Sequence, residues 1–277
     1  MPTHDDLGIR MKTFYEQIPK TKLMRRTPVA IRIDGKAFHT FTRGFEKPFD
    51  DILIKSMQAT MKYLCENIQG CVLGYTQSDE ITLILVDYKK FNSSAWFDYE
   101  VQKMCSIAAS MATMAFNREF EKRVDDFELK HLIELGGYIE YDCEANRKLA
   151  EVYYKAIEKG AMFDARVFNI PKEEVTNLIY WRQLDATRNS IQMVGQANFS
   201  HRELQDKSCN EIQDMLMVQK GINWNDFPVN QKRGSCCIKE VYEHEGVQRT
   251  HWVIDNNIPI FKEEGREYID RLIMVGE

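Results

Sequence analysis

The run EITLILVDY, residues 80–88, constrains the fold most strongly, because it is apolar on both faces of an extended chain. Such a run is typical of a strand in the centre of a sheet. A second apolar run, CVLGYTQ, precedes it at 71–77. Gln77, Ser78 and Asp79 therefore lie in or beside a tight turn between two neighbouring strands. The pattern predicts a central β-hairpin whose turn carries polar side chains.

The remaining periodicity predicts helices and strands in an α+β order, with helices on one face of a mostly antiparallel sheet. The other expected strands are 28–33 and 163–171, followed by a late hairpin from 235–243 and 250–256. The expected helices are 50–68, about 99–123, 171 toward 198, and one that starts at a Ser208–Glu211 capping box and ends near Gly221. We expect one palm-like domain over residues 1–277, with helical and hairpin additions after about residue 170.

Composition excludes several classes of protein. The 277 residues are 44% hydrophobic and 29% charged, which is typical of a globular protein. No apolar run approaches the ~18 residues of a membrane span, and residues 1–12 lack an apolar signal core, so we expect a cytoplasmic protein without a membrane partner. The seven cysteines include no C-x-x-C pair, which favours reduced thiols over a zinc site.

Charge is distributed unevenly along the chain. Residues 1–47 hold ten Lys or Arg and five Asp or Glu, whereas the whole chain has a net charge of −5. The segment KTKLMRR (20–26) concentrates four of these cations. A local basic patch on an acidic body fits a phosphate ligand bound at one place, although a solvated charged segment remains the alternative.

Two strand ends carry carboxylates that the topology can bring together. Asp34 ends the strand AIRI, and Asp79 and Glu80 lie at the hairpin turn. If the first strand lies beside the hairpin, these carboxylates meet and raise one another's pKa, which divalent cations would relieve. Oxygen ligands select Mg²⁺, which also takes phosphate oxygens. Read alone, however, Asp34-Gly35 is equally consistent with an ordinary turn.

The neighbouring residues suit phosphate chemistry. Gly35 lets the backbone approach a metal or a phosphate closely. Lys36, Lys47 and Ser78 supply positive charge and a hydroxyl. Two Mg²⁺ ions at such a site would stabilise both the attacking and the leaving oxygen of an in-line displacement at phosphorus.

Five blocks in this order resemble the tRNA-histidine guanylyltransferase family over about residues 5–235. They are RIDGKAFHTFTRGFEKPFD (32–50), GYTQSDEITLIL (74–85), FDARVF (163–168), WRQLDA (181–186) and GINWNDFPVNQKRG (221–234). The resemblance implies a polymerase-like palm that adds nucleotides to tRNA 5′ ends in the 3′-to-5′ direction. It also implies activation of a 5′-monophosphate by ATP or GTP, and a homotetramer.

The resemblance assigns site residues as well. Asp34, Asp79 and the Gly35 carbonyl would hold two Mg²⁺ ions. The expected triphosphate contacts are Lys36, Ala37, Phe38, His39, Lys47 and Ser78. Glu80 belongs to the same motif without a definite role.

Two departures from the family pattern concern the substrate. Members specific for histidine tRNA carry His-Ile-Asn-Asn-Leu-Tyr-Asn where this chain has residues 187–193, and only Asn189 is kept. They also carry an arginine where this chain has Glu100, although Lys103 is retained. These departures resemble the guanylyltransferase-like branch, which repairs truncated 5′ ends by copying the opposite strand.

Other readings stay open from the sequence. Arg25, Arg26, Lys232 and Arg233 are candidate RNA contacts, and three tryptophans (Trp181, Trp224 and Trp252) either stack on bases or pack in the core. A strict tRNA-histidine guanylyltransferase that adds a single guanosine is the nearest alternative function. A palm-type nucleotidyl cyclase and a non-catalytic RNA-binding protein are the alternatives from other classes.

Overall fold

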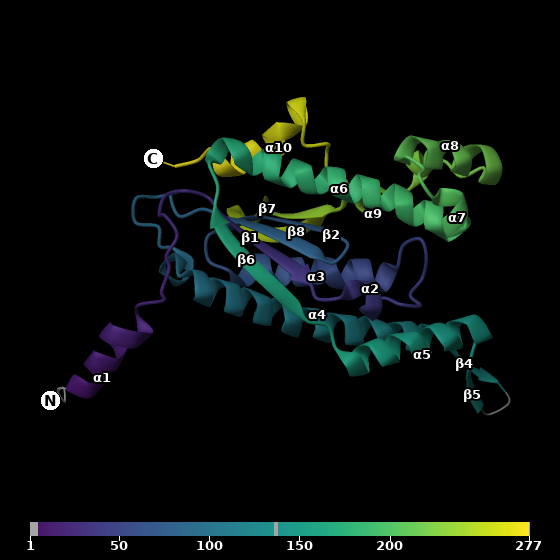
Figure 1. Cartoon of the computed structure of the whole chain (residues 1–277), viewed down its shortest axis with the longest axis horizontal. Coiled ribbons are helices and arrows are strands. Elements are labelled where there is room, and N and C mark those ends of the chain that lie inside the picture. The colour runs from purple at the N-terminus through teal and green to yellow at the C-terminus, as the bar shows by residue number, and fades with distance from the viewer. Residues whose placement is uncertain (1–4, 136–137, 277) are drawn as a thin grey trace.

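A six-stranded antiparallel sheet forms the centre of the protein, in the order β6-β1-β3-β2-β7-β8 (Figure 1). The computed structural model describes residues 5–135 and 138–276. The strands are β1 (Val29–Gly35), β2 (Cys71–Gln77), β3 (Glu80–Leu85), β6 (Phe163–Asn169), β7 (Ser235–His244) and β8 (Val247–Asp255). The α+β class with an antiparallel sheet is therefore confirmed.

The first strand lies where the polar strand ends can meet. β1 pairs with β3 on one side and with β6 on the other, so it joins the hairpin to the edge of the sheet. β2 and β3 form the expected hairpin, with only Ser78 and Asp79 between them. β3 ends at Leu85, three residues before the predicted end.

Helices cover both faces of the sheet, not one as the sequence predicted (Figure 1). α3 (Asp51–Asn67) and α4 (Val101–His131) pack on one face, and α6 (Lys172–Asn198) and α10 (Glu267–Ile273) pack on the other. Every residue of β2 is buried, so neither of its faces can be left to water. The run that is apolar on both faces already indicated two covered faces.

The predicted long helices are confirmed, with shifts at their ends. α6 matches the predicted helix to Asn198, and α4 runs to His131, beyond the predicted end at 123. The capping box of Ser208 and Glu211 starts α8 (Cys209–Lys220). The sequence analysis missed a small hairpin, β4 (Leu132–Leu135) and β5 (Tyr138–Tyr141), and the helix α5 (Glu144–Lys159) that follows it.

Short helices connect the larger elements. They are α2 (Phe38–Phe41), η2 (Trp96–Tyr99), α7 (His201–Leu204), η3 (Trp224–Asp226), α9 (Val229–Arg233) and η4 (Glu263–Arg266). A third apolar cluster joins the C-terminal half of α6 to α8 around Val194 and Leu216. The strands β7 and β8 continue the same sheet, but the prediction of one domain over residues 1–277 stays a prediction.

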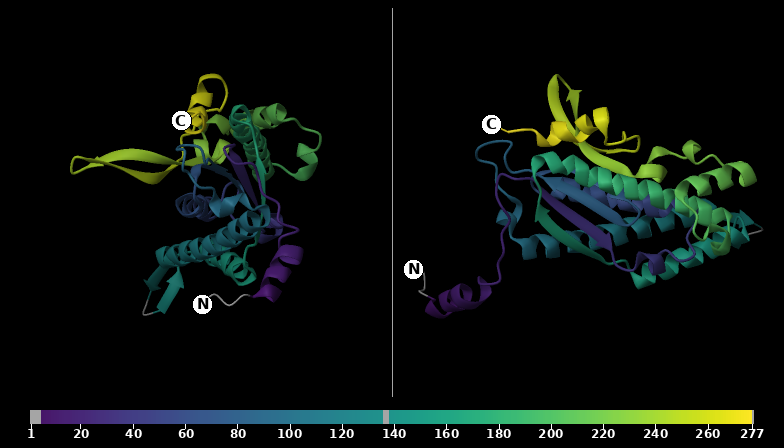
Figure 2. Two further views of the ribbon diagram at one scale, coloured as in Figure 1. Left: turned by 90° about the vertical axis from the view of Figure 1, so that its left-hand side faces the viewer. Right: turned by 45° about the horizontal axis from the view of Figure 1, so that its top comes forward.

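Two segments extend away from this body (Figure 2). α1 (Asp6–Met11) and the π-helical turn η1 (Lys12–Glu16) form an N-terminal arm in which no residue is buried. The outer part of the β7–β8 hairpin, residues 239–251, is exposed on both strands. Within the described ranges, no helix is both long and apolar enough to cross a membrane.

Candidate active site

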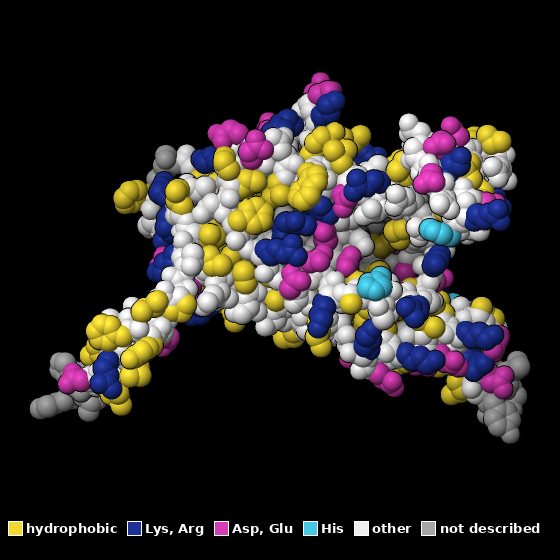
Figure 3. All heavy atoms as spheres, viewed as in Figure 1, with side chains coloured by type: hydrophobic (Ala, Val, Ile, Leu, Met, Phe, Trp, Pro, Cys, Tyr) yellow, Lys and Arg dark blue, Asp and Glu magenta, His cyan; other side chains and the backbone are white. Residues whose placement is uncertain are grey.

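Three carboxylates lie side by side across three strands at one end of the sheet. Asp34 on β1 is opposite Glu80 on β3 and opposite Asp164 on β6. Cross-strand partners in an antiparallel sheet place their side chains on the same face. Two residues away from Asp34 and Asp164 along their strands, Arg32 is opposite Arg166. An acidic row and a basic pair therefore lie next to each other, and Figure 3 shows acidic and basic side chains gathered beside a hollow between α6 and α2.

The environment of the two aspartates disfavours their negative charge. Burial raises the pKa of Asp34, and the charges of Glu80 and Asp164 raise it further, whereas Arg166 and Arg32 lower it. Burial raises the pKa of Asp79 to about 6, and the charge of Asp34 adds to the rise. The hydrogen bond that Ser78 Oγ donates to Asp79 Oδ1 at 3.0 Å has the opposite effect and lowers this pKa. A divalent cation between Asp34 and Asp79 would relieve this unfavourable charge.

Glu80 has a different environment, although it belongs to the same row. Its Oε1 pairs with Arg32 Nη2 at 3.0 Å, and its Oε2 accepts a hydrogen bond from Arg182 Nε at 2.8 Å. Gln77 Nε2 donates to the same Oε2 at 2.8 Å. Both carboxylate oxygens are therefore occupied by protein donors, so Glu80 positions the turn and the two arginines instead of offering a free ligand.

Sequence reasoning missed Arg182, the buried residue of this cluster. It projects from α6, is 6% exposed, and joins Glu80 to Asp185, which accepts from Arg182 Nη2 at 2.8 Å. The motif WRQLDA had identified the segment but not the partner of its arginine. The burial of Arg182 and its bond to Glu80 become visible only in the structure. The sequence does not show which strand faces α6.

A cavity of about 560 Å³ opens beside Asp79 and contains most of the predicted nucleotide contacts. Its predicted lining residues are Gly35, Ala37, Phe38, His39, Lys47, Ser78 and Asp79. The exception is Lys36, whose backbone amide donates to the Met162 carbonyl at 2.9 Å and which does not line the cavity. Ala37 has a left-handed backbone with φ of 54°, which turns the chain from β1 into α2.

Gly35 is required here for packing as well as for close approach. A Cβ added at this position would lie 2.3 Å from the ring of Phe38. Any larger residue would therefore displace Phe38 and with it the start of α2. The glycine keeps the Gly35 carbonyl and the Asp34 carboxylate beside the turn that carries Asp79.

The loop that carries Lys47 is held by Asp50, which directly precedes α3. Asp50 Oδ1 accepts from the Leu53 amide at 2.8 Å and caps α3. Its Oδ2 accepts from the Glu46 amide at 3.1 Å and from the buried Tyr153 hydroxyl at 2.7 Å. The missed helix α5 thus fixes one wall of the cavity.

A smaller cavity of about 80 Å³ lies next to the first, and the two share Asp50, Leu53, Ser78 and Met193 as lining residues. Asn189 lines this smaller cavity. The segment 187–193, in which the chain departs from the histidine-specific pattern, therefore faces the site through Asn189 and Met193.

The donor set fits Mg²⁺. Among residues 5–135 and 138–276, no three His, Cys, Asp or Glu side chains are grouped as ligands of one metal ion. Two carboxylates and one carbonyl at Asp34, Asp79 and Gly35 suit a cation that keeps water and takes substrate phosphates as its other ligands. A ligand set made of oxygen atoms alone disfavours zinc, which prefers sulfur and nitrogen ligands.

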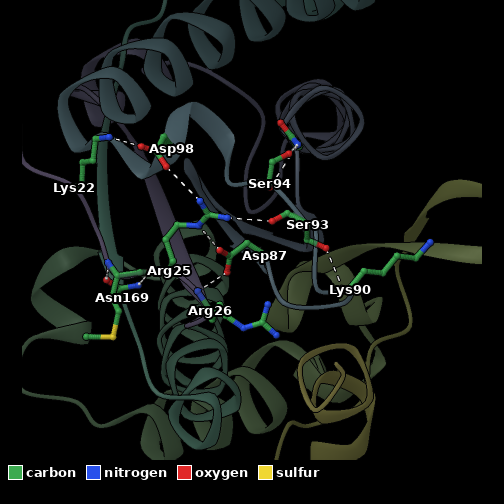
Figure 4. Close-up of polar contacts among 11 residues, drawn as sticks. Lys22, Arg25, Arg26, Asp87, Lys90, Ser93, Ser94, Asp98 and Asn169 are labelled. Carbon is green, nitrogen blue, oxygen red and sulfur yellow. Dashed lines mark hydrogen bonds and ion pairs between the residues drawn. The ribbon is translucent and has the colours of Figure 1, made fainter. Parts of the chain in front are cut away.

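Other predicted contacts lie away from the cavity. Figure 4 shows Arg25 directed toward Asp87, Asp98 and Ser93, with Nε bonded to Asp87 Oδ2 at 2.6 Å. Arg25 therefore ties the N-terminal segment to the loop after β3, and its side chain, which is 44% exposed, stays a predicted RNA contact. Arg26 bonds to Asp87 through its backbone amide, and its exposed side chain stays a predicted RNA contact. Lys103 lies outside the cavity, with Nζ 4.9 Å from the ring centroid of Phe97.

Lys232, another predicted RNA contact, is largely buried. It is 7% exposed and donates from Nζ to the Asn225 carbonyl, above the ring of Trp224. It therefore stabilises the turn before β7 and is not presented to RNA, whereas Arg233 is half-buried and stays a predicted contact. Trp224 and Trp252 pack in the core at 9% and 8% exposure, but Trp181 is 51% exposed.

Comparison with known proteins shows the family to which the chain belongs. The family model Thg1, described as tRNAHis guanylyltransferase, matches residues 9–171, which is more than half of the chain. The chain belongs to the tRNA-histidine guanylyltransferase family. This membership confirms the resemblance seen in the sequence, and with it the prediction that the chain is an enzyme of the nucleotidyltransferase class.

Solved structures of this family resemble the chain over nearly its whole length. A bacterial guanylyltransferase-like protein in complex with ATP has a TM-score of 0.78 and 40% identity, covering 96% of this chain and 98% of that one. A bacterial protein of the same description in complex with GTP has a TM-score of 0.75 and 38% identity, covering 98% and 100%. The tRNA(His) guanylyltransferase of Schizosaccharomyces pombe is 26% identical over 248 residues, or 85% of this chain and 81% of that protein.

Proposed function

We propose that this guanylyltransferase-like enzyme repairs tRNA 5′ ends by template-dependent addition of nucleotides in the 3′-to-5′ direction. One observation carries the proposal. Asp79 lines a cavity of about 560 Å³ together with Lys47, His39 and Ser78. Asp34 directly precedes Gly35, another lining residue, and its charge raises the pKa of Asp79. Two acids beside a cavity that can hold a triphosphate suit phosphoryl or nucleotidyl transfer.

Residues of the chain would hold two Mg²⁺ ions through the carboxylates of Asp34 and Asp79 and the carbonyl of Gly35. When bound, these ions would neutralise charge on the phosphates and on the attacking and leaving oxygens. Lys47 and His39 would bind the outer phosphates of the triphosphate, and Ser78 would orient Asp79 through the 3.0 Å hydrogen bond. The amides of Phe38 and His39, which start α2, would donate to phosphate oxygens.

The reaction has two displacements at phosphorus. A 5′-monophosphate oxygen of the tRNA attacks the α-phosphorus of ATP or GTP, and pyrophosphate leaves. The 3′-hydroxyl of the incoming triphosphate then attacks the activated 5′-phosphorus, and the activating nucleoside monophosphate leaves. Bacterial relatives at 40% and 38% identity hold ATP and GTP, which supports both nucleotides as ligands here.

Repair of a truncated end is favoured over strict addition of one guanosine by residues 187–193. Ser190 and Met193, two of the residues that depart from the histidine-specific pattern, line the cavities, so these departures lie where they can affect substrate choice. Addition of a single guanosine to histidine tRNA is the second candidate, since the matching family model carries that description.

We also propose a cytoplasmic homotetramer. The N-terminal arm supports association with further copies of the chain, because its large apolar side chains are not buried by residues 5–135 and 138–276 of one copy. Those at least half exposed are Leu7, Ile9, Phe14 and Tyr15, and Ile18, two residues beyond the arm, is exposed as well. Contiguous exposed apolar surface of this kind marks interaction sites.

Substitution of the acids tests the assignment. Asp34→Ala and Asp79→Ala should each abolish nucleotide addition to a tRNA that lacks its first 5′ nucleotide, because the metal ions would lose a ligand. Binding of the tRNA in a filter assay should persist. Glu264→Ala, an exposed acid in η4 at the opposite end of α6, is the matched control and should keep turnover.

Retained turnover in either aspartate variant would refute the two-metal assignment. The same protein should also be incubated with triphosphates and Mg²⁺ in the absence of RNA. Formation of a cyclic nucleotide would favour the cyclase alternative. RNA binding without any turnover of the parent protein would favour a non-catalytic role.

A further inference from the structure

Trp181 is the exception among the tryptophans of this chain. Trp96, Trp224 and Trp252 are each less than 10% exposed, whereas Trp181 is 51% exposed. Leu184, one turn further along α6, is 50% exposed. A large aromatic ring on the surface leaves apolar area in water at a cost, so its position relative to the acidic row becomes informative.

The indole is fixed in place by the charged cluster beneath it. The guanidinium carbon of Arg182 lies 4.5 Å from the ring centroid, and that of Arg32 lies 5.3 Å from it. Arg182 is buried and bonded to Glu80 and Asp185, and Arg32 pairs with the other oxygen of Glu80. The two arginines, which are themselves fixed by salt bridges, therefore fix the position of the exposed ring. Because the ring is already ordered, less conformational entropy is lost when a ligand stacks on it.

The ring lies on the opposite side of the acidic row from the triphosphate cavity. Trp181 contacts Arg32, Arg32 binds Glu80, and Glu80 is opposite Asp34 on β1. The cavity, by contrast, is lined by α2, the loop that carries Lys47, and the turn at Ser78 and Asp79. An in-line displacement needs its two substrates to approach the reacting phosphorus from different sides, and Trp181 lies on the side of the acidic row away from the triphosphate cavity.

We propose that Trp181 is a stacking platform for the base of the 5′-terminal nucleotide of the RNA. This proposal rests on the function proposed above, and it names the residue that receives the RNA end. A nucleotide stacked on the indole would have its 5′-phosphate directed past Arg32 toward Asp34. Aromatic stacking tolerates any base, because every base has a π face. A platform of this kind suits an enzyme that repairs ends of different sequence, with the template supplying the specificity.

The experiment uses a tRNA lacking its first nucleotide, with 2-aminopurine as the new terminal base. Stacking on an indole quenches 2-aminopurine fluorescence, so binding to the full-length protein should quench it. Trp181→Ala should remove the quenching and weaken RNA binding by about tenfold, which is within the range for loss of one base–aromatic contact. Trp181→Phe should keep most of both, whereas Trp181→Leu, which keeps apolar bulk without a π face, should behave like the alanine variant.

Two controls separate stacking from a structural role and from binding of the free nucleotide. Phe91→Ala removes an aromatic residue that is 86% exposed in the loop after β3, and it should change neither quenching nor RNA affinity. The KM for the triphosphate should be unchanged in Trp181→Ala, because the cavity does not include this residue. A raised KM for the triphosphate with unchanged RNA affinity would overturn the proposal.

Absence of quenching in the parent protein, or equal quenching in the leucine and phenylalanine variants, would also overturn it. Failure of the proposed function is distinguishable, because it is scored by nucleotide addition and not by fluorescence. Terminal quenching that depends on Trp181 in a protein that adds no nucleotide would uphold the platform and refute the repair activity.

Discussion

Asp79 shows at the scale of one residue how the site is built at a cost to stability. Its pKa is raised from 3.8 to about 6, mainly by burial. A carboxyl whose pKa is higher in the folded state stabilises the fold at pH values below its unfolded pKa, and this contribution is lost as the pH rises through about 6. Near neutral pH the ionised Asp79 therefore destabilises the metal-free protein.

We predict that Asp79→Asn stabilises the metal-free enzyme while abolishing its activity. The amide has a similar shape and carries no charge, so the free energy of unfolding at about pH 7.5 should rise by ~1–3 kcal/mol. At about pH 5 the gain should be roughly half as large, because Asp79 is then mostly protonated in the folded parent. Urea denaturation in the presence of a chelator measures both. An equal or lower stability of the variant at the higher pH would contradict the account.

The same pKa predicts how Mg²⁺ binding depends on pH. Protons compete with the metal for Asp79, so the affinity for Mg²⁺ should be nearly constant above about pH 7 and should fall by up to tenfold per unit below about pH 6. Calorimetric titration of the nucleotide-bound protein with Mg²⁺ at several pH values would show this. An affinity that stays constant down to about pH 5 would exclude Asp79 as a ligand.

Whole elements, rather than single residues, set the shape of the cavity. Some of these elements could be predicted from the sequence and others could not. The hairpin, β1 and the length of α6 followed from apolar periodicity and turn residues, so the meeting of Asp34 with Glu80 was predictable. The rotation of α6 about its axis was not, because periodicity does not show which strand a helix faces. Arg182 and its bonds to Glu80 were missed for this reason.

α5 was missed although its sequence has an apolar face. Ala150, Tyr153 and Ala156 recur every third residue and are buried against the rest of the protein. Its role could not be deduced, since Tyr153 bonds to Asp50, 103 residues earlier in the chain. Only the folded structure brings these two residues together.

We predict that Tyr153→Phe loosens the loop that carries Lys47. Asp50 would lose one of its three hydrogen-bond donors in a buried place, which costs about 1–3 kcal/mol of stability. If the loop binds the nucleotide as proposed, the KM for the triphosphate should rise several-fold with little change in kcat, because Asp34 is unaffected. Tyr154→Phe is the matched control on the same helix. Tyr154 bonds to Glu128 instead, so this variant should leave the KM unchanged.

At the scale of the whole molecule, the part of the chain that the structure describes leaves the N-terminal arm exposed. No residue of α1 or η1 is buried, and the arm extends away from the body in Figure 1 and in the right view of Figure 2. Apolar side chains in such an arm are expected to pack against another copy of the chain.

Deletion of residues 1–18 should therefore reduce the size of the assembly. Sedimentation velocity of the full-length protein should give a mass of four chains, and the truncated protein should give a smaller species. Phe14→Ser combined with Ile18→Ser in the full-length chain should act in the same direction without shortening it. An identical mass for all three proteins would show that the arm takes no part in assembly.

Templated repair is the central claim, and changing the template tests it most directly. The substrate is a tRNA lacking its first 5′ nucleotide, prepared in four forms that differ only in the base opposite the gap. Each form is incubated with Mg²⁺, ATP for activation and each labelled triphosphate in turn. The account predicts that the nucleotide added is the Watson–Crick complement of the opposing base in all four forms. Addition of guanosine to every form, or only to intact histidine tRNA, would contradict it.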